Sequence, residues 1–225
     1  MAFLKKKFEE LPEDAVIISQ EQAYNYQLKL IHNWDKLSEV WALRFGPGVL
    51  GAIGGLSGIY INKHFRTKLK LGNYGKFSTY LPIVILPALF STINHKVSIQ
   101  KSIILQSEMC PVCIQMRAAG FQVGLGTIYP AVIAPFATLM FATRHYTYRL
   151  PSITEQPKEV FKLIAKFSKP LSGFIAGSAI VSMLVAMYIT YLEMKQYYSL
   201  QEKLEKLSEK YDQDTLITQQ RVQNI

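Results

Sequence analysis

Four apolar runs, separated by polar and basic segments, constrain the fold of this chain more than any other feature of its sequence. The runs cover about residues 46–62, 78–94, 118–142 and 171–192. A run of roughly 20 apolar residues with few charges is long enough to cross the hydrocarbon core of a bilayer as a helix. Because backbone groups in lipid must satisfy their hydrogen bonds internally, we predict an all-α, polytopic helical membrane protein with about four transmembrane helices.

The segments outside the four runs are polar and amphipathic. Residues 1–45 form an N-terminal tail in which apolar residues recur at helical spacing: Leu30, Trp34, Leu37 and Trp41. This pattern predicts an amphipathic helix that lies at the membrane interface or against a partner protein. Residues 193–225 follow the transmembrane domain at 46–192 and are predicted to form a polar C-terminal helix and tail, in which Glu202 can pair with Lys206.

Five residues around the first run are candidate interfacial anchors: Trp34, Trp41, Arg44, Lys63 and Arg66. Aromatic rings and basic side chains are favoured at the boundary between hydrocarbon and lipid headgroups. We therefore predict that these two tryptophans and three cations fix the depth of the first helix in the bilayer.

Glycine pairs spaced four residues apart occur in the first, third and fourth runs. This spacing places small residues on one helix face, where the backbone of another helix can approach closely. The predicted packing residues are Gly51, Gly54, Gly55, Gly58, Gly120, Gly124, Gly173 and Gly177. In the second run, Pro82 and Pro87 predict a bent helix, because each removes a hydrogen-bond donor inside the helix.

The excess of 25 Lys and Arg over 16 Asp and Glu is concentrated in two segments that flank apolar runs. Residues 62–77 carry five basic residues and no acid, and residues 143–170 carry six basic residues and two acids. Basic loops of this kind contact lipid headgroups or set the orientation of a membrane protein. No nucleic-acid-binding motif accompanies them, so we expect the lipid bilayer, and no nucleic acid, as their partner.

Residues that could carry chemistry are few. Cys110-Pro-Val-Cys113 is a single cysteine pair, whereas a closed zinc site needs four ligands, so we interpret it as a disulfide or as two thiols that brace a loop. The four histidines have no spacing that places two on one helix face, and the four runs contain no ionisable residue to mark an ion path. We predict no catalytic, cofactor-binding or metal residues, and no enzymatic activity.

Six short blocks in and beside the apolar runs form a pattern of their own. They are Gly58-x3-Asn62-x2-Phe65-Arg66-x2-Leu69, Leu81-Pro82-x4-Pro87-x-Leu89, Cys110-x2-Cys113-x3-Arg117, Tyr129-Pro130, Ala142-x-Arg144-x-Tyr146 and Ser168-Lys169-Pro170. Together these blocks resemble the transmembrane protein 126 family of the mitochondrial inner membrane. The cysteine pair is similar to the A-type paralog and the charged C-terminal helix to the B-type, which leaves the subtype open.

The resemblance implies a multi-pass protein of the mitochondrial inner membrane that acts, without a cofactor, as a non-enzymatic assembly factor for respiratory complex I. Its implied partners are membrane-arm subunits of complex I and other assembly factors, which for the B-type include an acyl-CoA-dehydrogenase-like factor and two associated soluble factors. The basic loops would then face the matrix and both termini the intermembrane space.

Two alternative functions stay open at this point. An insertase-like helper for nascent inner-membrane proteins would need a hydrophilic groove that faces lipid. A small transporter or channel would need a polar path between its spans, and ionisable residues within them would support that function.

Overall fold

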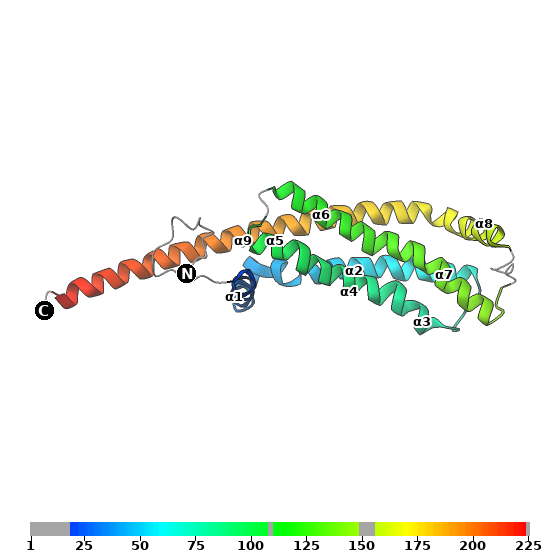
Figure 1. Ribbon diagram of the computed structural model, residues 1–225, viewed down its shortest axis with the longest axis horizontal. Coiled ribbons are helices and arrows are strands. Elements are labelled where there is room, and N and C mark those ends of the chain that lie inside the picture. The colour runs from blue at the N-terminus through cyan, green and yellow to red at the C-terminus, as the bar shows by residue number, and fades with distance from the viewer. Residues whose placement is uncertain (1–18, 108–109, 149–155, 224–225) are drawn as a thin grey trace.

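The computed structural model describes residues 19–107, 110–148 and 156–223. Most of this part of the chain is helical, and no strand occurs in it. Four of its helical segments are long and apolar enough to cross a membrane: Leu37–Lys68, Lys76–Ile104, Pro111–Arg144 and Pro157–Lys210. They lie side by side as an elongated bundle (Figure 1), and each predicted apolar run falls inside one of them. The prediction of an all-α protein with four membrane-crossing helices is confirmed.

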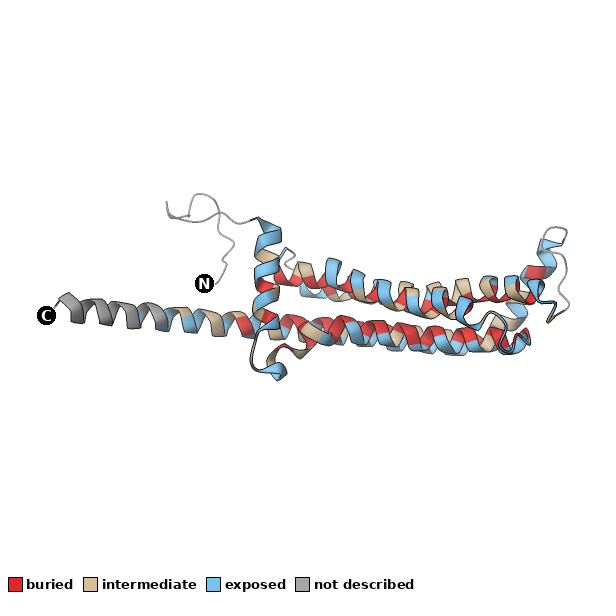
Figure 2. Ribbon diagram, turned by 90° about the horizontal axis from the view of Figure 1, so that it is seen from below, coloured by how far each residue is buried: buried red, intermediate tan, exposed pale blue. Residues whose placement is uncertain are grey.

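The N-terminal amphipathic segment forms two helices instead of one. α1 (Gln20–His32) begins after Ser19, whose side chain closes a capping box, and it ends at Asn33. After a short turn, α2 (Leu37–Lys68) begins and continues through the first apolar run. α1 runs across the end of the bundle (Figure 2). Trp34 therefore lies between two helices, in a segment where asparagine and aspartate favour a turn over a helix interior.

The second span is a continuous helical segment whose winding changes along its length. It consists of α3 (Lys76–Tyr80), the π-helical η2 (Leu81–Ile85), α4 (Leu86–Asn94), the π-helical η3 (His95–Gln100) and α5 (Lys101–Ile104). Pro82 lies within η2 and Pro87 follows it, and each proline removes one donor from the helical ladder. η3 contains no proline. Because π-helical turns frequently occur at functional sites, the residues of η3 are of particular interest.

The third and fourth spans complete the bundle. The third consists of α6 (Pro111–Val123), the π-helical η4 (Gly124–Ile128) and α7 (Tyr129–Arg144). The fourth consists of α8 (Pro157–Ser168), the 3-10 turn η5 (Lys169–Leu171) and α9 (Ser172–Gln223). α9 continues through residue 193 without a break and projects beyond the bundle (Figure 1). We call the end of the bundle that carries α1 the α1 end, and the end that carries residues 69–75 the loop end.

Apolar side chains fill the bundle and also cover its outside. The largest buried cluster lies at the α1 end and joins α1, α2, α6 and α9; it includes Ile31, Val40, Leu43, Ile114 and Tyr197. On the outer faces, Leu56, Phe136 and Leu184 are more than half exposed. Figure 2 shows this division between buried inner and exposed outer faces along the helices. Such an exterior is solvated by hydrocarbon, which agrees with a membrane-embedded bundle.

Candidate functional site

A buried His–Glu contact, which is an ion pair when the imidazole is protonated, joins the second and fourth spans at the α1 end. The side chains of His95 in η3 and Glu193 in α9 are 4% and 0% exposed, and His95 Nε2 lies 2.9 Å from Glu193 Oε2. Both residues belong to membrane-length helical segments. Ionisable side chains inside membrane helices are costly and generally functional, so this pair is the centre of the candidate site.

Sequence analysis missed this pair because two predicted runs ended one residue too early. The second run ended at residue 94 and the fourth at residue 192, which left His95 and Glu193 just outside. The predicted runs contain no ionisable residue, but the membrane-length segments of the structure extend past them and include both members of this pair. The signal that could have found them is the recurrence of apolar residues beyond both ends: Val97, Ile99 and Ile103, and Met194, Tyr197 and Leu200.

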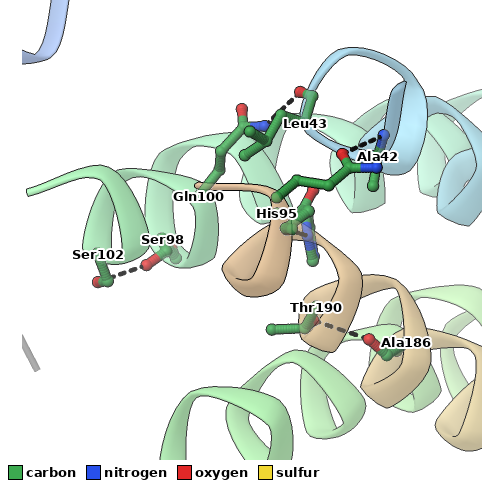
Figure 3. A network of polar contacts seen from close by, with 10 residues as sticks. Ala42, Leu43, His95, Ser98, Gln100, Ser102, Ala186 and Thr190 are labelled. Carbon is green, nitrogen blue, oxygen red and sulfur yellow. Dashed lines mark hydrogen bonds and ion pairs between the residues drawn. The ribbon is translucent and has the colours of Figure 1, made fainter. Parts of the chain in front are cut away.

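Two glutamines beside the ion pair bond to the backbone of the first span. Pro47 has no N–H, so the carbonyl of Leu43 loses its usual partner inside α2. Gln100 Nε2 donates to this carbonyl over 2.5 Å, as Figure 3 shows. From α9, Gln196 Oε1 accepts a hydrogen bond from the Ala42 N–H over 2.9 Å. We call these four side chains the polar network: His95, Gln100, Glu193 and Gln196.

The carboxyl group of Glu193 lies directly against the backbone of α2. A Cβ atom at Gly46 would lie 2.9 Å from Glu193 Oε1 and 2.8 Å from Ile189 Cγ2, closer than side chains pack. Within the described part of the chain, Glu193 Oε1 is buried without a hydrogen-bond partner. The contact with His95 is therefore what compensates the burial of this carboxyl group.

α1 and an ion pair at the start of α2 lie at the same end of the bundle as the polar network. Burial raises the pKa of the Tyr24 phenol in α1, and the charge on nearby Glu193 raises it further. At the start of α2, Glu39 accepts from Trp34 Nε1 over 3.0 Å and pairs with Lys203 Nζ over 2.7 Å.

The polar network can hold α2, η3 and α9 together, and its imidazole and carboxyl groups can share or exchange a proton. In the described residues, no three His, Cys, Asp or Glu side chains gather to hold a metal ion.

A second polar layer lies nearer the middle of the bundle. The side chain of Gln122 in α6 is buried, with an exposed fraction of 2%. Its Nε2 donates to the Leu50 carbonyl over 2.9 Å, and its Oε1 accepts from Ser91 Oγ. Ser57 Oγ donates to the carbonyl of Gly126. These hydrogen bonds join the first three spans. They pair polar groups that would find no hydrogen-bond partner in hydrocarbon.

Arg66, predicted to anchor the first span in lipid headgroups, is instead buried at the loop end. Its guanidinium donates to the carbonyls of Gly72 (2.7 Å), Tyr74 (3.0 Å) and Gly75 (3.3 Å), and to Thr79 Oγ1 (2.9 Å). The side chain is only 6% exposed. The anchor prediction is wrong for Arg66, because the loop after α2 folds back and surrounds the guanidinium with its own acceptors.

Three of the other four predicted anchors also make contacts within the chain. Arg44 donates to the carbonyls of Ile31 (3.0 Å) and Trp34 (2.8 Å), which fastens the end of α1 to α2. Trp34 and Trp41 are half-buried and pack against core clusters at the α1 end. Lys63 is exposed on the outside of α2. Of the five, Lys63 is thus the side chain with the exposure expected of a headgroup contact.

Cys110 and Cys113 form a disulfide at the start of the third span. Cys110 caps the N-terminus of α6, and its Sγ accepts from the Cys113 N–H over 3.3 Å. Both residues are exposed. Of the two sequence interpretations, a disulfide and a pair of free thiols, the structure contains the disulfide.

The glycines of α2 lie where other helices approach it closely. A Cβ atom at Gly51 would lie 2.7 Å from the Ala88 carbonyl, and one at Gly58 would lie 2.5 Å from the Ile83 carbonyl. At Gly54 it would lie 3.1 Å from the Cα atom of Gly126, whereas Gly55 has room for ordinary contact. The face predicted for helix packing therefore meets η2 and α4 on one side and η4 on the other.

Four predicted glycines of the third and fourth spans do not pack in this way. A Cβ atom at any of four positions would meet no heavy atom within 4 Å: Gly120, Gly124, Gly173 and Gly177. Within the described residues no helix packs closely against these four positions, so their role in helix packing stays a prediction. Their spacing places them on one helix face, but α6, η4 and α9 turn that face away from the rest of the bundle.

Gly58→Ala should lower the free energy of unfolding by about 1 to 3 kcal/mol, because the new methyl group would force the backbones of α2 and η2 apart. The matched control is Gly48→Ala on the same helix, where no atom lies within 4 Å and the better helix propensity of alanine should leave stability equal or slightly higher. Unfolding by SDS in mixed micelles, followed by tryptophan fluorescence, measures both. Equal stabilities of the two variants would contradict the close crossing.

Comparisons with known proteins agree with the sequence blocks. The family model described as "Transmembrane protein 126" matches residues 25–210. A protein of Drosophila melanogaster named "Transmembrane protein 126" is 48% identical over 217 residues, which cover 96% of this chain and 97% of that relative. No solved structure matches the chain.

Proposed function

Because the chain belongs to the transmembrane protein 126 family, we propose that it is an assembly factor for mitochondrial respiratory complex I. In this proposal it is a multi-pass protein of the mitochondrial inner membrane that binds and stabilises membrane-arm intermediates, and it has no enzymatic activity. Its partners are membrane-arm subunits and other assembly factors, including the acyl-CoA-dehydrogenase-like factor and its associated soluble factors.

The observation that supports this function best is the pair of small-residue faces that no helix covers within the part of the chain that the structure describes. Gly120 with Gly124 and Gly173 with Gly177 are open on the outside of the bundle. In a membrane, small residues let a second helix approach closely enough for van der Waals contact to hold the two together. A partner subunit with a transmembrane helix is the molecule that such faces suit.

The projecting part of α9 supports binding outside the membrane as well. α9 has 52 residues, which at 1.5 Å per residue is about 78 Å, far more than the roughly 30 Å of a hydrocarbon core. Beyond the bundle it carries Glu202 paired with Lys206 over 2.6 Å, with Leu207 exposed beside them. This mixture of charged and apolar surface suits a soluble partner.

The proposal predicts that loss of this protein depletes complex I and its membrane-arm intermediates. Abundance of complex I and of its subcomplexes is measured by native electrophoresis and quantitative mass spectrometry in cells that lack the protein. Re-expression of the full chain should restore both. Normal complex I abundance without the protein would contradict the proposal.

A transporter is a second candidate because the His95–Glu193 pair lies inside membrane-length helices. Such a pair can belong to a proton path through the bundle, but it can equally hold two helices together without any transport. Proton flux into liposomes that contain the purified protein decides between them. We expect no flux above that of protein-free liposomes, and flux that Glu193→Gln abolishes would favour the transporter.

We predict that the loop end faces the matrix and that the α1 end, with the disulfide, faces the intermembrane space. The basic residues of the first loop lie at the loop end, where the positive-inside tendency places them in the matrix. The Cys110–Cys113 disulfide lies at the opposite end, and disulfides persist in oxidising compartments.

Mitoplasts with an intact inner membrane test this orientation. After reduction with an impermeant phosphine, an impermeant maleimide should label Cys110 and Cys113, which are the only cysteines of the chain. The control, Lys68→Cys in a chain with both native cysteines changed to serine, should label only after detergent is added. Labelling of the control variant without detergent would show that the loop end faces the intermembrane space, opposite to this prediction.

A further inference from the structure

The Cys110–Cys113 disulfide is a reactive group for which the proposed function has no use. It joins two exposed residues at the start of α6, at the α1 end of the bundle (Figure 1). Cysteines are among the residues most often buried in proteins, and buried cysteines are generally inert. Because this pair is exposed, thiols in solution or on another protein can reach its sulfur atoms.

The disulfide lies outside the hydrocarbon core of the membrane, where thiolates can form. The third span, Pro111–Arg144, has 34 residues, which at 1.5 Å per residue is about 51 Å, whereas a hydrocarbon core is roughly 30 Å thick. Arg117 and Arg144 are both exposed, and charged side chains are costly in hydrocarbon. The core therefore falls between the two arginines, and both cysteines precede Arg117 on the outer side of this boundary.

As a structural brace, this disulfide would add little. A disulfide stabilises a fold mainly by restricting the unfolded chain, and the effect is smallest when few residues are enclosed. Cys110 and Cys113 are only three residues apart, and their Cα atoms are 5.3 Å apart. α6 begins at Pro111, so Cys113 already lies in the first turn of the helix. The helix itself keeps residues at this spacing close together, and reduction should leave α6 intact.

The first turn of α6 stabilises a thiolate at Cys110. Cys110 is the N-cap of the helix, and its Sγ accepts a hydrogen bond from the Cys113 N–H over 3.3 Å. The N-terminus of a helix carries a partial positive charge, which favours a negatively charged sulfur. A stabilised thiolate is a good leaving group in disulfide exchange. The S–S bond should therefore break readily when another thiolate attacks Cys113 Sγ.

We propose that Cys110 and Cys113 form a redox-active disulfide that exchanges with external thiols, supplied by glutathione or by cysteines of a partner polypeptide. A reactant thiolate attacks Cys113 Sγ and forms a mixed disulfide, while the Cys110–Cys113 bond breaks and its electron pair leaves with Cys110 Sγ. A second reactant thiolate then attacks the reactant sulfur of the mixed disulfide, and Cys113 Sγ leaves as a thiolate.

The exchange is balanced in atoms and electrons. Two reactant thiols are oxidised to one disulfide, and the disulfide of the protein is reduced to two thiols. The two protons that the reactant thiols release are taken up by Cys110 and Cys113. The exchange occurs once per chain, so it is a modification of this protein and not a turnover.

Equilibration of the full-length protein, purified in mild detergent, with glutathione tests the proposal. At pH 7, about 10 mM glutathione with about 0.1 mM of its disulfide leaves roughly 99% of a structural disulfide oxidised but reduces a redox-active pair substantially. Maleimide labelling after an acid quench, followed by intact mass spectrometry, counts the reduced chains. We expect more than about a tenth of the chains to carry two free thiols, and a smaller fraction would overturn the proposal.

Circular dichroism of the same samples shows whether the exchange takes place in the folded protein. Helix content should be the same before and after reduction. A loss of helix on reduction would show that the bond braces the fold, which would overturn the proposal.

Two matched variants, Cys113→Ser and Cys110→Ser, test the stabilised thiolate. Each retains one thiol, and serine is itself a good N-cap, so both should keep the start of α6. Alkylation by iodoacetamide is measured at pH 7, where stabilisation enlarges the thiolate fraction of Cys110, and at pH 10, where both thiols are largely ionised. The ratio of the Cys110 rate to the Cys113 rate should fall about fivefold to tenfold between these pH values. An unchanged ratio would overturn the assignment of Cys110 as the leaving group.

Mixed disulfides in native membranes identify the source of the thiols. In Cys110→Ser, Cys113 keeps any mixed disulfide that it forms, because the neighbouring thiol is missing. Acid-quenched membranes are analysed by non-reducing electrophoresis and mass spectrometry. A mass increase of one glutathione, or a larger adduct with a polypeptide, supports the exchange and names its reactant. Recovery of Cys113 as a free thiol in every chain would overturn the proposal.

Discussion

Glu193→Ala should lower the free energy of unfolding by about 3 to 5 kcal/mol, because removal of one member of a buried ion pair leaves the other without compensation. His95 would face a cavity with no acceptor, and the contact between the Glu193 side chain and Gly46 would be lost. SDS unfolding in mixed micelles measures the effect through Trp34 and Trp41, the only tryptophans of the chain, which lie at the same end.

The matched control is Glu202→Ala on the same helix, where an exposed pair with Lys206 is broken and no measurable loss is expected. The double variant His95→Leu with Glu193→Met should recover most of the stability, since apolar residues of similar volume can replace a buried ion pair. If Glu193→Ala unfolds at the same SDS concentration as wild type, the pair does not hold these spans together.

Arg66→Met should cost about 3 kcal/mol or more, since it removes hydrogen bonds from a charged donor to four acceptors around the first loop. The structural change should be confined to the first loop and the start of the second span, because these acceptors belong to residues 72–79. Limited proteolysis at Lys70, which is exposed in that loop, should become much faster in the variant.

Lys63→Met is the matched control for Arg66→Met. Lys63 lies on the same helix, three residues earlier, but is exposed. Its replacement should leave both the unfolding transition and the rate of cleavage at Lys70 unchanged. Equal cleavage rates in the Arg66 variant and wild type would mean that the loop keeps its conformation without the guanidinium.

The number of spans was predictable because hydropathy is a local property of the sequence. Each apolar run needs only its own residues to be recognised, and each falls inside one membrane-length helix. Helix bounds were less predictable, because polar residues continue a helix whenever they face the bundle interior. His95 and Glu193 are examples: both are buried, and both lie one residue beyond the predicted run.

The candidate site itself was not predictable, because its residues meet only in the folded chain. His95 and Glu193 are 98 residues apart, and Gln100 reaches the carbonyl that Pro47 leaves without a partner, 57 residues away. Sequence patterns contain no record of such pairings. For the same reason the basic character of Arg66 predicted a headgroup contact, although its acceptors are backbone carbonyls of the following loop.

The glycine pattern shows what the spacing of residues in the sequence can predict about helix packing and what it cannot. Spacing by four residues places two glycines on one helix face, and this holds in α2 and α9 alike. Whether a neighbour covers that face depends on how the helix is rotated in the bundle. Gly51 and Gly58 face other helices at close range, whereas Gly173 and Gly177 face outward.

The most direct test of the proposed function is the native complex in which the protein migrates. Mitochondrial membranes are extracted with a gentle detergent, separated by native electrophoresis and analysed by mass spectrometry in every fraction. We predict that the protein comigrates with membrane-arm intermediates of complex I. Migration only as the isolated protein, or with a complex that contains no complex I subunit, would contradict the proposed function.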